Sequence, residues 1–121
     1  MRAHFRNSGL TKHKGGGAVR FRLTELADAD LAGIEDWVEE TRGADTADRV
    51  SDEIDARIRE IAGHPLRFPV YQFDGDFGLM HEYRSANAGR FKVFYWVNES
   101  EGFVEIWRIR HVSSDFTRVG W

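Results

Sequence analysis

The chain carries two stretches of helical periodicity. The first predicts a helix from about Asp28 to Gly43, and the second predicts a helix that is capped by Asp45 or Thr46 and ended by Gly63 and Pro65. The apolar residues recur every three or four positions: Ala27, Leu31, Ile34 and Val38 in the first, and Ala47, Val50, Ile54, Ile58 and Ile61 in the second. Because the connection is short, the two helices should form an antiparallel hairpin.

Strand-like alternation flanks the two helices. Residues 19–23 alternate between apolar and basic side chains, which is typical of a half-buried strand. A loop at 64–78 contains both prolines, and three strand segments follow it at 79–86, 90–99 and 103–112. Turn sequences separate these three segments, so they should form an antiparallel meander.

The order of elements predicts an α+β fold. It consists of an N-terminal strand, a two-helix antiparallel hairpin and a three-stranded antiparallel meander, with the helices packed on one face of a four-stranded sheet. The other face would then be solvated or covered by a partner. Residues 1–18 show no sustained period and end near three glycines, so they are expected to be a flexible basic tail or a non-native start. Residues 19–121 are expected to form a single domain.

Composition limits the class of protein. With 121 residues the chain suits one domain with one core. It has no cysteine, which excludes disulfides and cysteine-based zinc sites and favours a cytoplasmic location. No apolar run approaches 18 residues, so no membrane span is expected, and the basic N-terminus lacks the apolar region of a secretory signal.

Charge is distributed unevenly along the chain. Residues 1–22 carry six cations and no acid, whereas residues 23–62 carry 13 acids and 4 cations, and the net charge is −3. A protein that wraps nucleic acid over a broad surface is usually basic overall. Any anion-binding surface is therefore expected to be local and to lie in the C-terminal half.

Common catalytic motifs do not occur in the sequence. It contains no phosphate-binding loop, nucleotide-binding glycine pattern, HExxH helix or GxSxG elbow. The five histidines have no metal-ligand spacing, so neither a metal nor a cofactor is expected. A structural hydrogen bond is the favoured interpretation of each histidine, although His111 could carry a proton if a second polar group lay beside it.

The strands of the C-terminal half carry cations among aromatic residues. Alternation places Arg90, Lys92, Phe94 and Trp96 on one face of their strand, and Trp107 lies on the next strand. Five cations come from three adjacent strands: Arg84, Arg90, Lys92, Arg108 and Arg110. Converging arginines bind phosphate or carboxylate groups through forked hydrogen bonds. Alternatively, these cations pair with nearby acids such as Glu82, Glu99, Glu105 and Asp115.

Four segments in this order resemble the RelE/ParE superfamily of toxins from type II toxin–antitoxin systems. The segments are LADADLAGIEDWV, ADRVSDEIDARIREIAGHP, EYRSANAGRFKVFYWV and VEIWRIRHVSSDF. The resemblance covers residues 19–116 and is nearest to the ParE-like branch. It implies a cytoplasmic toxin with growth-inhibiting and plasmid-stabilising roles. A cognate antitoxin with a separate DNA-binding part would neutralise it in a toxin–antitoxin hetero-oligomer.

The resemblance leaves the cellular target open. ParE-like members resemble inhibitors of DNA gyrase without bond-breaking chemistry, and this is the favoured expectation. RelE-like members cleave mRNA on the ribosome, and the residues here that would serve such a ribonuclease are Arg84, Lys92, Arg108, Arg110 and His111. A third alternative is an inert antitoxin-binding domain. Lys92 and Arg84 match basic strand positions of the superfamily, and His111 matches a histidine of ParE-like members.

The chain also departs from the ribonuclease pattern. Ser113 or Ser114 stands where the ribonucleases have a basic residue, and the tail has no tyrosine. The resemblance implies that the antitoxin covers the acidic helical hairpin and the open sheet face. The residues expected to bind the target or the antitoxin are Arg84, Arg90, Lys92, Phe94, Trp96 and Trp107.

Overall fold

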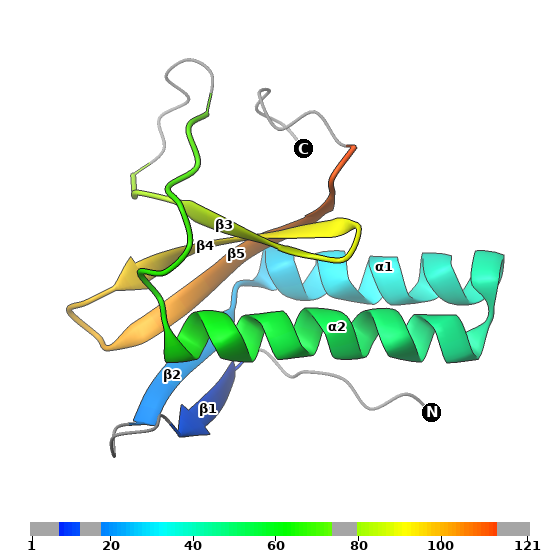
Figure 1. The fold of residues 1–121 in the computed structure, drawn as a ribbon, viewed down its shortest axis with the longest axis horizontal. Helices are drawn as coiled ribbons and strands as arrows, with labels where there is room; N and C mark the ends of the chain where they lie inside the picture. The colour runs from blue at the N-terminus through cyan, green and yellow to red at the C-terminus, as the bar shows by residue number, and fades with distance from the viewer. Residues whose placement is uncertain (1–7, 13–17, 74–79, 114–121) are drawn as a thin grey trace.

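A two-helix hairpin packs on a five-stranded mixed sheet (Figure 1). The computed structural model describes residues 8–12, 18–73 and 80–113. Helix α1 spans Glu25–Arg42 and helix α2 spans Ala44–Gly63. The strands are β1 (Ser8–Lys12), β2 (Ala18–Leu23), β3 (Arg84–Ala88), β4 (Phe91–Asn98) and β5 (Phe103–His111).

The strand order confirms the predicted fold and adds one strand to it. The order is β1-β2-β5-β4-β3, in which β2 and β5 are parallel and all other neighbours are antiparallel. Strand β1 lies within residues 1–18, for which the sequence predicted no strand. Its five residues, SGLTK, are too short and too polar to show alternation, and β1 forms by pairing with the edge of β2.

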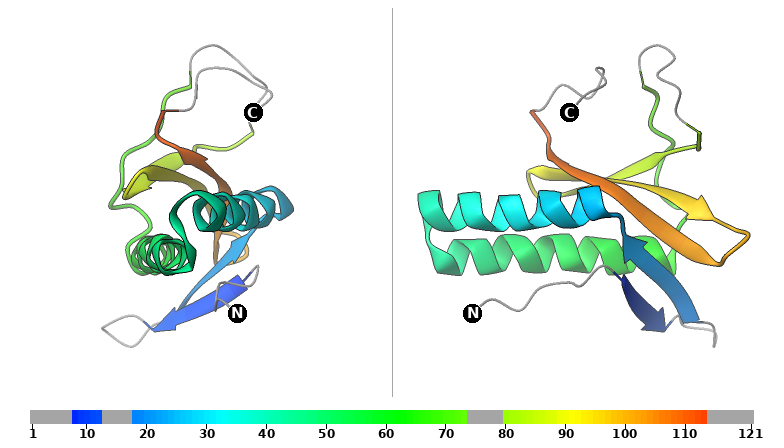
Figure 2. Two further views of the ribbon diagram at one scale, coloured as in Figure 1. Left: turned by 90° about the vertical axis from the view of Figure 1, so that its right-hand side faces the viewer. Right: turned by 180° about the vertical axis from the view of Figure 1, so that it is seen from behind.

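The hydrophobic core lies between the hairpin and the sheet face that it covers (Figure 2). Helix α2 contributes Ile54, Ile58 and Ile61, and the stripe predicted from the sequence is thus the buried one. The sheet contributes fully buried side chains from three strands: Phe21, Val93, Tyr95, Ile106 and Ile109. The connecting end of the hairpin projects beyond the strands (Figure 1).

Three predicted boundaries were wrong. Helix α1 begins at Glu25 rather than near Asp28, because the Thr24 hydroxyl accepts a hydrogen bond from the Ala27 N–H at 3.1 Å. Helix α2 begins at Ala44, directly after Gly43, and no side chain caps it. Strand β3 begins at Arg84 rather than at residue 79, because the preceding backbone bonds instead to the α2–β3 connection, where the Tyr71 N–H donates to the Tyr83 carbonyl at 2.8 Å.

Beyond the end of β2, the start of α1 forms the hydrogen bonds with the edge of β5. Strand β2 pairs with β5 as far as Ile106, and the Thr24 N–H then donates to the Ile106 carbonyl at 2.9 Å. The Thr24 hydroxyl donates to the Trp107 carbonyl at 2.9 Å, and the Ile109 N–H donates to the Asp30 carboxylate at 3.0 Å. The first two turns of α1 thus satisfy backbone groups that a neighbouring strand would otherwise pair.

Asp30 also forms a two-point ion pair with Arg108. The guanidinium donates Nε to Oδ2 at 2.8 Å and Nη2 to Oδ1 at 3.0 Å, and both side chains are nearly buried. This confirms, for Arg108, the interpretation that strand cations pair with acids. The acid, however, is on α1 and was not among those considered.

In the described part of the chain, neither helix combines the length and apolar character of a membrane span.

We expect Asp30→Ala to lower the free energy of unfolding by about 3 kcal/mol, because it leaves Arg108 buried without its charge partner and the Ile109 N–H without its acceptor. Urea denaturation measures the change. The matched control is Asp36→Ala, which removes an exposed acid from the same helix and should stay within about 0.5 kcal/mol of the wild type. Equal stability of the two variants would contradict the structural role of Asp30.

Candidate functional site

An aromatic cluster covers much of the sheet face that points away from the helices. Its members are Tyr71, Phe73, Tyr83, Phe94 and Trp107. The ring centroids of Tyr71 and Phe94 are 5.0 Å apart, those of Tyr83 and Trp107 are 4.3 Å apart, and Phe94 is 0% exposed. The expectation that this face is uncovered at Phe94 was therefore wrong, because the α2–β3 connection folds back over it.

Trp96 lies on the same face and is also partly covered. Its ring stacks on His81 with centroids 3.5 Å apart and an interplanar angle of 3°. Trp96 and Trp107 are half-buried, so each keeps only part of its ring for a ligand. His81 lies in the connection just before β3 and acts here as a packing residue.

The cations proposed for a ribonuclease do not converge. Arg84 turns to the helix side, where its Nη1 donates to the Phe68 carbonyl at 2.7 Å. Lys92 lies on the opposite face, with its ammonium 5.7 Å from the Tyr71 ring centroid, and its register partner Arg110 shares that face. Arg108 is engaged by Asp30. The structure thus brings Lys92 and Arg110 together, places Arg84 on the opposite face and holds the Arg108 guanidinium in an ion pair with Asp30.

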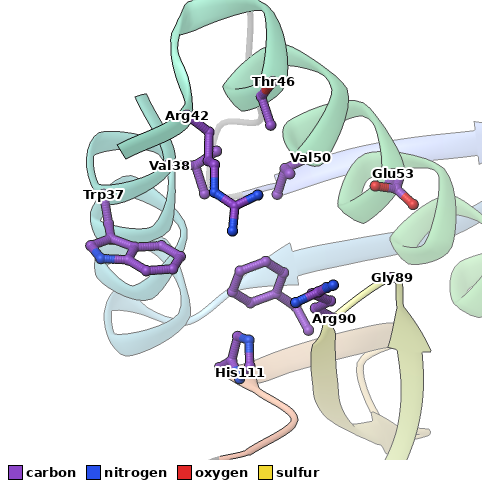
Figure 3. Close-up of a pocket in the computed structure, with 10 residues that line it drawn as sticks. Trp37, Val38, Arg42, Thr46, Val50, Glu53, Gly89, Arg90 and His111 are labelled. Carbon is purple, nitrogen blue, oxygen red and sulfur yellow. The ribbon is translucent and has the colours of Figure 1, made fainter. Parts of the chain in front are cut away.

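His111 and Arg90 lie instead in a pocket under the projecting end of the hairpin. This hairpin-end pocket has a volume of about 360 Å³. Its lining residues come from α1, α2, the β3–β4 turn, the start of β4 and the end of β5: Trp37, Val38, Arg42, Thr46, Val50, Glu53, Gly89, Arg90, Phe91 and His111. Arg42 extends from α1 into the space between the hairpin and the strands, and Arg90 and His111 face it from the strand side (Figure 3).

The two arginines of the hairpin-end pocket differ from most others in the protein. Ion pairs or hydrogen bonds engage the side chains of seven arginines: Arg22, Arg49, Arg57, Arg59, Arg67, Arg84 and Arg108. Within residues 8–12, 18–73 and 80–113, the guanidinium groups of Arg42 and Arg90 have no such partner. Their charges are therefore directed into a concave surface and stay available there.

His111 is hydrogen-bonded to Ser113 through one of its ring nitrogens. The Ser113 N–H donates to Nδ1 at 3.1 Å, and the Ser113 hydroxyl lies 2.7 Å from the same atom. Because Nδ1 accepts a backbone hydrogen bond, the neutral ring carries its proton on Nε2. In that tautomer the Nε2–H is the hydrogen-bond donor of the ring.

Sequence reasoning missed the helical half of this pocket. Trp37 is next to Val38 of the apolar stripe of α1, and its 53% exposure shows that it does not belong to the core. Arg42 and Glu53 resemble ordinary surface charges of a helix. The available signal was the large aromatic residue just outside the apolar stripe, because such a residue has to be either exposed or covered by a partner.

A second charged cluster joins β2 to β5 on the face opposite the hairpin. Arg22 donates to Glu105 through Nε at 2.8 Å and Nη2 at 2.7 Å, and Asn98 donates to the same carboxylate at 3.2 Å. The hydrogen bonds from Arg22 lower the pKa of Glu105 below its usual 4.5, although burial opposes the shift. This confirms Glu105 as a pairing acid, with Arg22 rather than a cation of the meander.

We expect the Arg22–Glu105 pair to make the protein less stable in acid. Because the pKa of Glu105 is lower in the folded chain, its contribution is complete above pH 4.5 and is lost as the pH falls below that value. Urea denaturation between pH 6 and pH 3 should therefore show a shallower loss of stability for Glu105→Gln than for the wild type. Parallel curves would show that Glu105 does not contribute to the acid sensitivity.

The comparisons with known proteins identify the family. The model of the ParE toxin of the type II toxin–antitoxin system parDE matches residues 21–116. No curated protein sequence matches the chain.

Among residues that the structure describes, no three acidic or histidine side chains gather as a metal site requires.

Two solved structures share the fold. A chain of the chromosomal ParDE toxin–antitoxin system from P. aeruginosa is 17% identical with a TM-score of 0.58, covering 75% of this chain and 92% of that one. A chain of the archaeal RelE–RelB complex from Pyrococcus horikoshii OT3 is 13% identical with a TM-score of 0.54, covering 80% of this chain and 98% of that one.

Proposed function

Because the chain belongs to the ParE toxin family of type II toxin–antitoxin systems, we propose that it arrests growth by binding DNA gyrase and that a cognate antitoxin neutralises it. The observation that supports a binding inhibitor over a ribonuclease is the dispersal of the candidate catalytic cations. RNA cleavage needs a proton carrier beside groups that stabilise the phosphorane. Here His111 lies in the hairpin-end pocket, Arg84 bonds to a backbone carbonyl and Arg108 is held by Asp30.

An antitoxin partner is supported by the solved neighbours and by the outer face of α1. Both neighbours are toxin–antitoxin systems or complexes. On α1, Leu26 and Trp37 are more than half exposed, and Gly33 lies between them. The spacings of seven and four residues place all three on one side of the helix. Nothing lies within 4 Å of the position that a Gly33 β-carbon would occupy, so a partner can approach the helix closely there.

The expected result in a cell is growth arrest when the chain is expressed without its antitoxin. In a purified assay, excess chain should reduce supercoiling by gyrase, and the toxin–antitoxin complex is the control that should leave supercoiling intact. Primer extension on translated messages should find no new 5′ ends. Full supercoiling together with new 5′ ends would identify the ribosome-associated ribonuclease instead. If the chain affects neither supercoiling nor the messages, the result would identify an inert antitoxin-binding domain.

The α1 surface can be tested by binding. We expect Leu26→Glu to weaken antitoxin binding by about 10-fold or more, because burying a leucine contributes about 1.5–3 kcal/mol. The matched control is Leu66→Glu, which changes a similarly exposed leucine in the α2–β3 connection. Calorimetry with the purified antitoxin measures both variants. A stronger effect of Leu66→Glu would place the antitoxin on another surface.

A further inference from the structure

We propose that the hairpin-end pocket receives one carboxylate side chain of the antitoxin, next to an apolar side chain of the same partner segment. This inference rests on the proposed function, because it assumes an antitoxin partner. It goes further by naming the chemical group that is recognised and the two arginines that recognise it, Arg42 and Arg90.

The first argument is the presence of uncommitted positive charge. The guanidinium groups of Arg42 and Arg90 come from α1 and from the β3–β4 turn, and both enter the hairpin-end pocket (Figure 3). Neither has a hydrogen-bond or ion-pair partner among the residues placed by the structure. Two cations that line one cavity repel each other. An anion between them attracts both, and this attraction outweighs the repulsion. Guanidinium groups match carboxylates in particular, because both groups are planar and can form two hydrogen bonds.

The second argument concerns the charge of the ligand. Glu53 also lines the pocket, and a β-carbon on Gly89 would lie 3.1 Å from a Glu53 carboxylate oxygen, so this acid rests against the β3–β4 turn. His111 accepts the Ser113 N–H at Nδ1. Arg42, Arg90 and Glu53 therefore give the lining two positive charges and one negative charge. This balance suits a singly charged carboxylate better than a phosphate monoester, which carries nearly two negative charges at neutral pH.

The third argument concerns the source of the carboxylate. Trp37 lies at the pocket and at one end of the exposed side of α1 that includes Leu26 and Gly33. Eleven residues of helix separate Leu26 from Trp37, which is about 16 Å at a rise of 1.5 Å per residue. A partner helix of about three turns that follows this side would bring its side chains to the pocket. The continuity of the apolar side with the charged pocket favours a polypeptide over a small free anion.

The apolar part of the lining completes the site. Val38, Val50 and Phe91 form walls beside the arginines, and Trp37 leaves half of its surface exposed. These side chains suit an apolar neighbour of the carboxylate, and its burial would exclude water from the ion pair and strengthen it. We thus expect an acidic residue beside an apolar residue in the antitoxin segment.

The test is a binding titration of the purified antitoxin with variants of the full chain. Arg42→Ala and Arg90→Ala should each raise Kd about 10–100-fold and reduce its dependence on salt, whereas Arg42→Lys should restore part of the affinity. The control is Arg67→Ala, which removes an exposed arginine from the α2–β3 connection and should leave Kd within about threefold. Thermal unfolding of each variant checks that it is folded.

A double-mutant cycle then identifies the carboxylate. Each acidic residue of the antitoxin is changed to its amide and combined with Arg42→Ala, and one acid should show a non-additive effect. Unchanged affinity of the two alanine variants, while the wild-type chain binds the antitoxin, would overturn this proposal and leave the proposed function intact. Failure of the wild-type chain to bind would count against the proposed function itself. Binding of inorganic phosphate that depends on both arginines, with antitoxin affinity unaffected by them, would overturn the proposal in favour of a small-anion site.

Discussion

The position of the helical hairpin depends on the edge of β5. Strand β2 covers this edge only as far as Ile106, and beyond it the first turns of α1 take over the hydrogen bonds through Thr24 and Asp30. A helix bonded to a strand edge at several points cannot slide along it without losing all of these bonds. The far end of α1 is therefore held in a fixed relation to the end of β5, and this relation places Arg42 opposite His111.

The second constraint is the way in which the chain covers the other sheet face. A single hairpin can cover one face only, and the sheet of this protein would expose Phe94 and Trp107 if nothing else intervened. The α2–β3 connection supplies Tyr71 and Phe73, and the resulting aromatic cluster buries Phe94 completely. The large apolar residues that remain exposed on a helix are on α1. The apolar surface available to a partner is therefore on the outer side of α1 rather than on the sheet.

The sequence predicted the parts of the fold that depend on local patterns. The stripe of α2 and the turns at Gly89 and Gly102, both with positive φ, follow from periodicity and from the conformational freedom of glycine. The pairing of Asp30 with Arg108 could not be predicted, because 78 residues separate the two and each has other charged residues nearer in the sequence. Strand β1 was missed because it depends on a partner strand and not on its own alternation.

The candidate site could also be predicted from the sequence only in part. Arg90 and His111 were recognised as residues of interest, but alternation alone assigned Arg90 to a face with Lys92 and Phe94. Its place at the tip of the β3–β4 turn frees it from that alternation and directs it to the hairpin. Arg42 and Glu53 carried no signal, since a charged residue on a helix is most often solvated. The pocket exists only where the projecting hairpin meets two strand ends, and this meeting is a property of the tertiary fold.

Paired and unpaired arginines therefore have different roles in this chain. Arg22 and Arg108 connect elements that are distant in sequence, and their loss would weaken the packing of β2 or α1 on β5. Arg42 and Arg90 have no ion-pair or hydrogen-bond partner within the described residues, and they line the hairpin-end pocket (Figure 3). Two like charges held at one cavity oppose folding slightly. Arg42 complements the dipole of α1 in its last turn, but the fold gives no such reason for placing Arg90 beside it. A binding partner that carries the opposite charge does give such a reason.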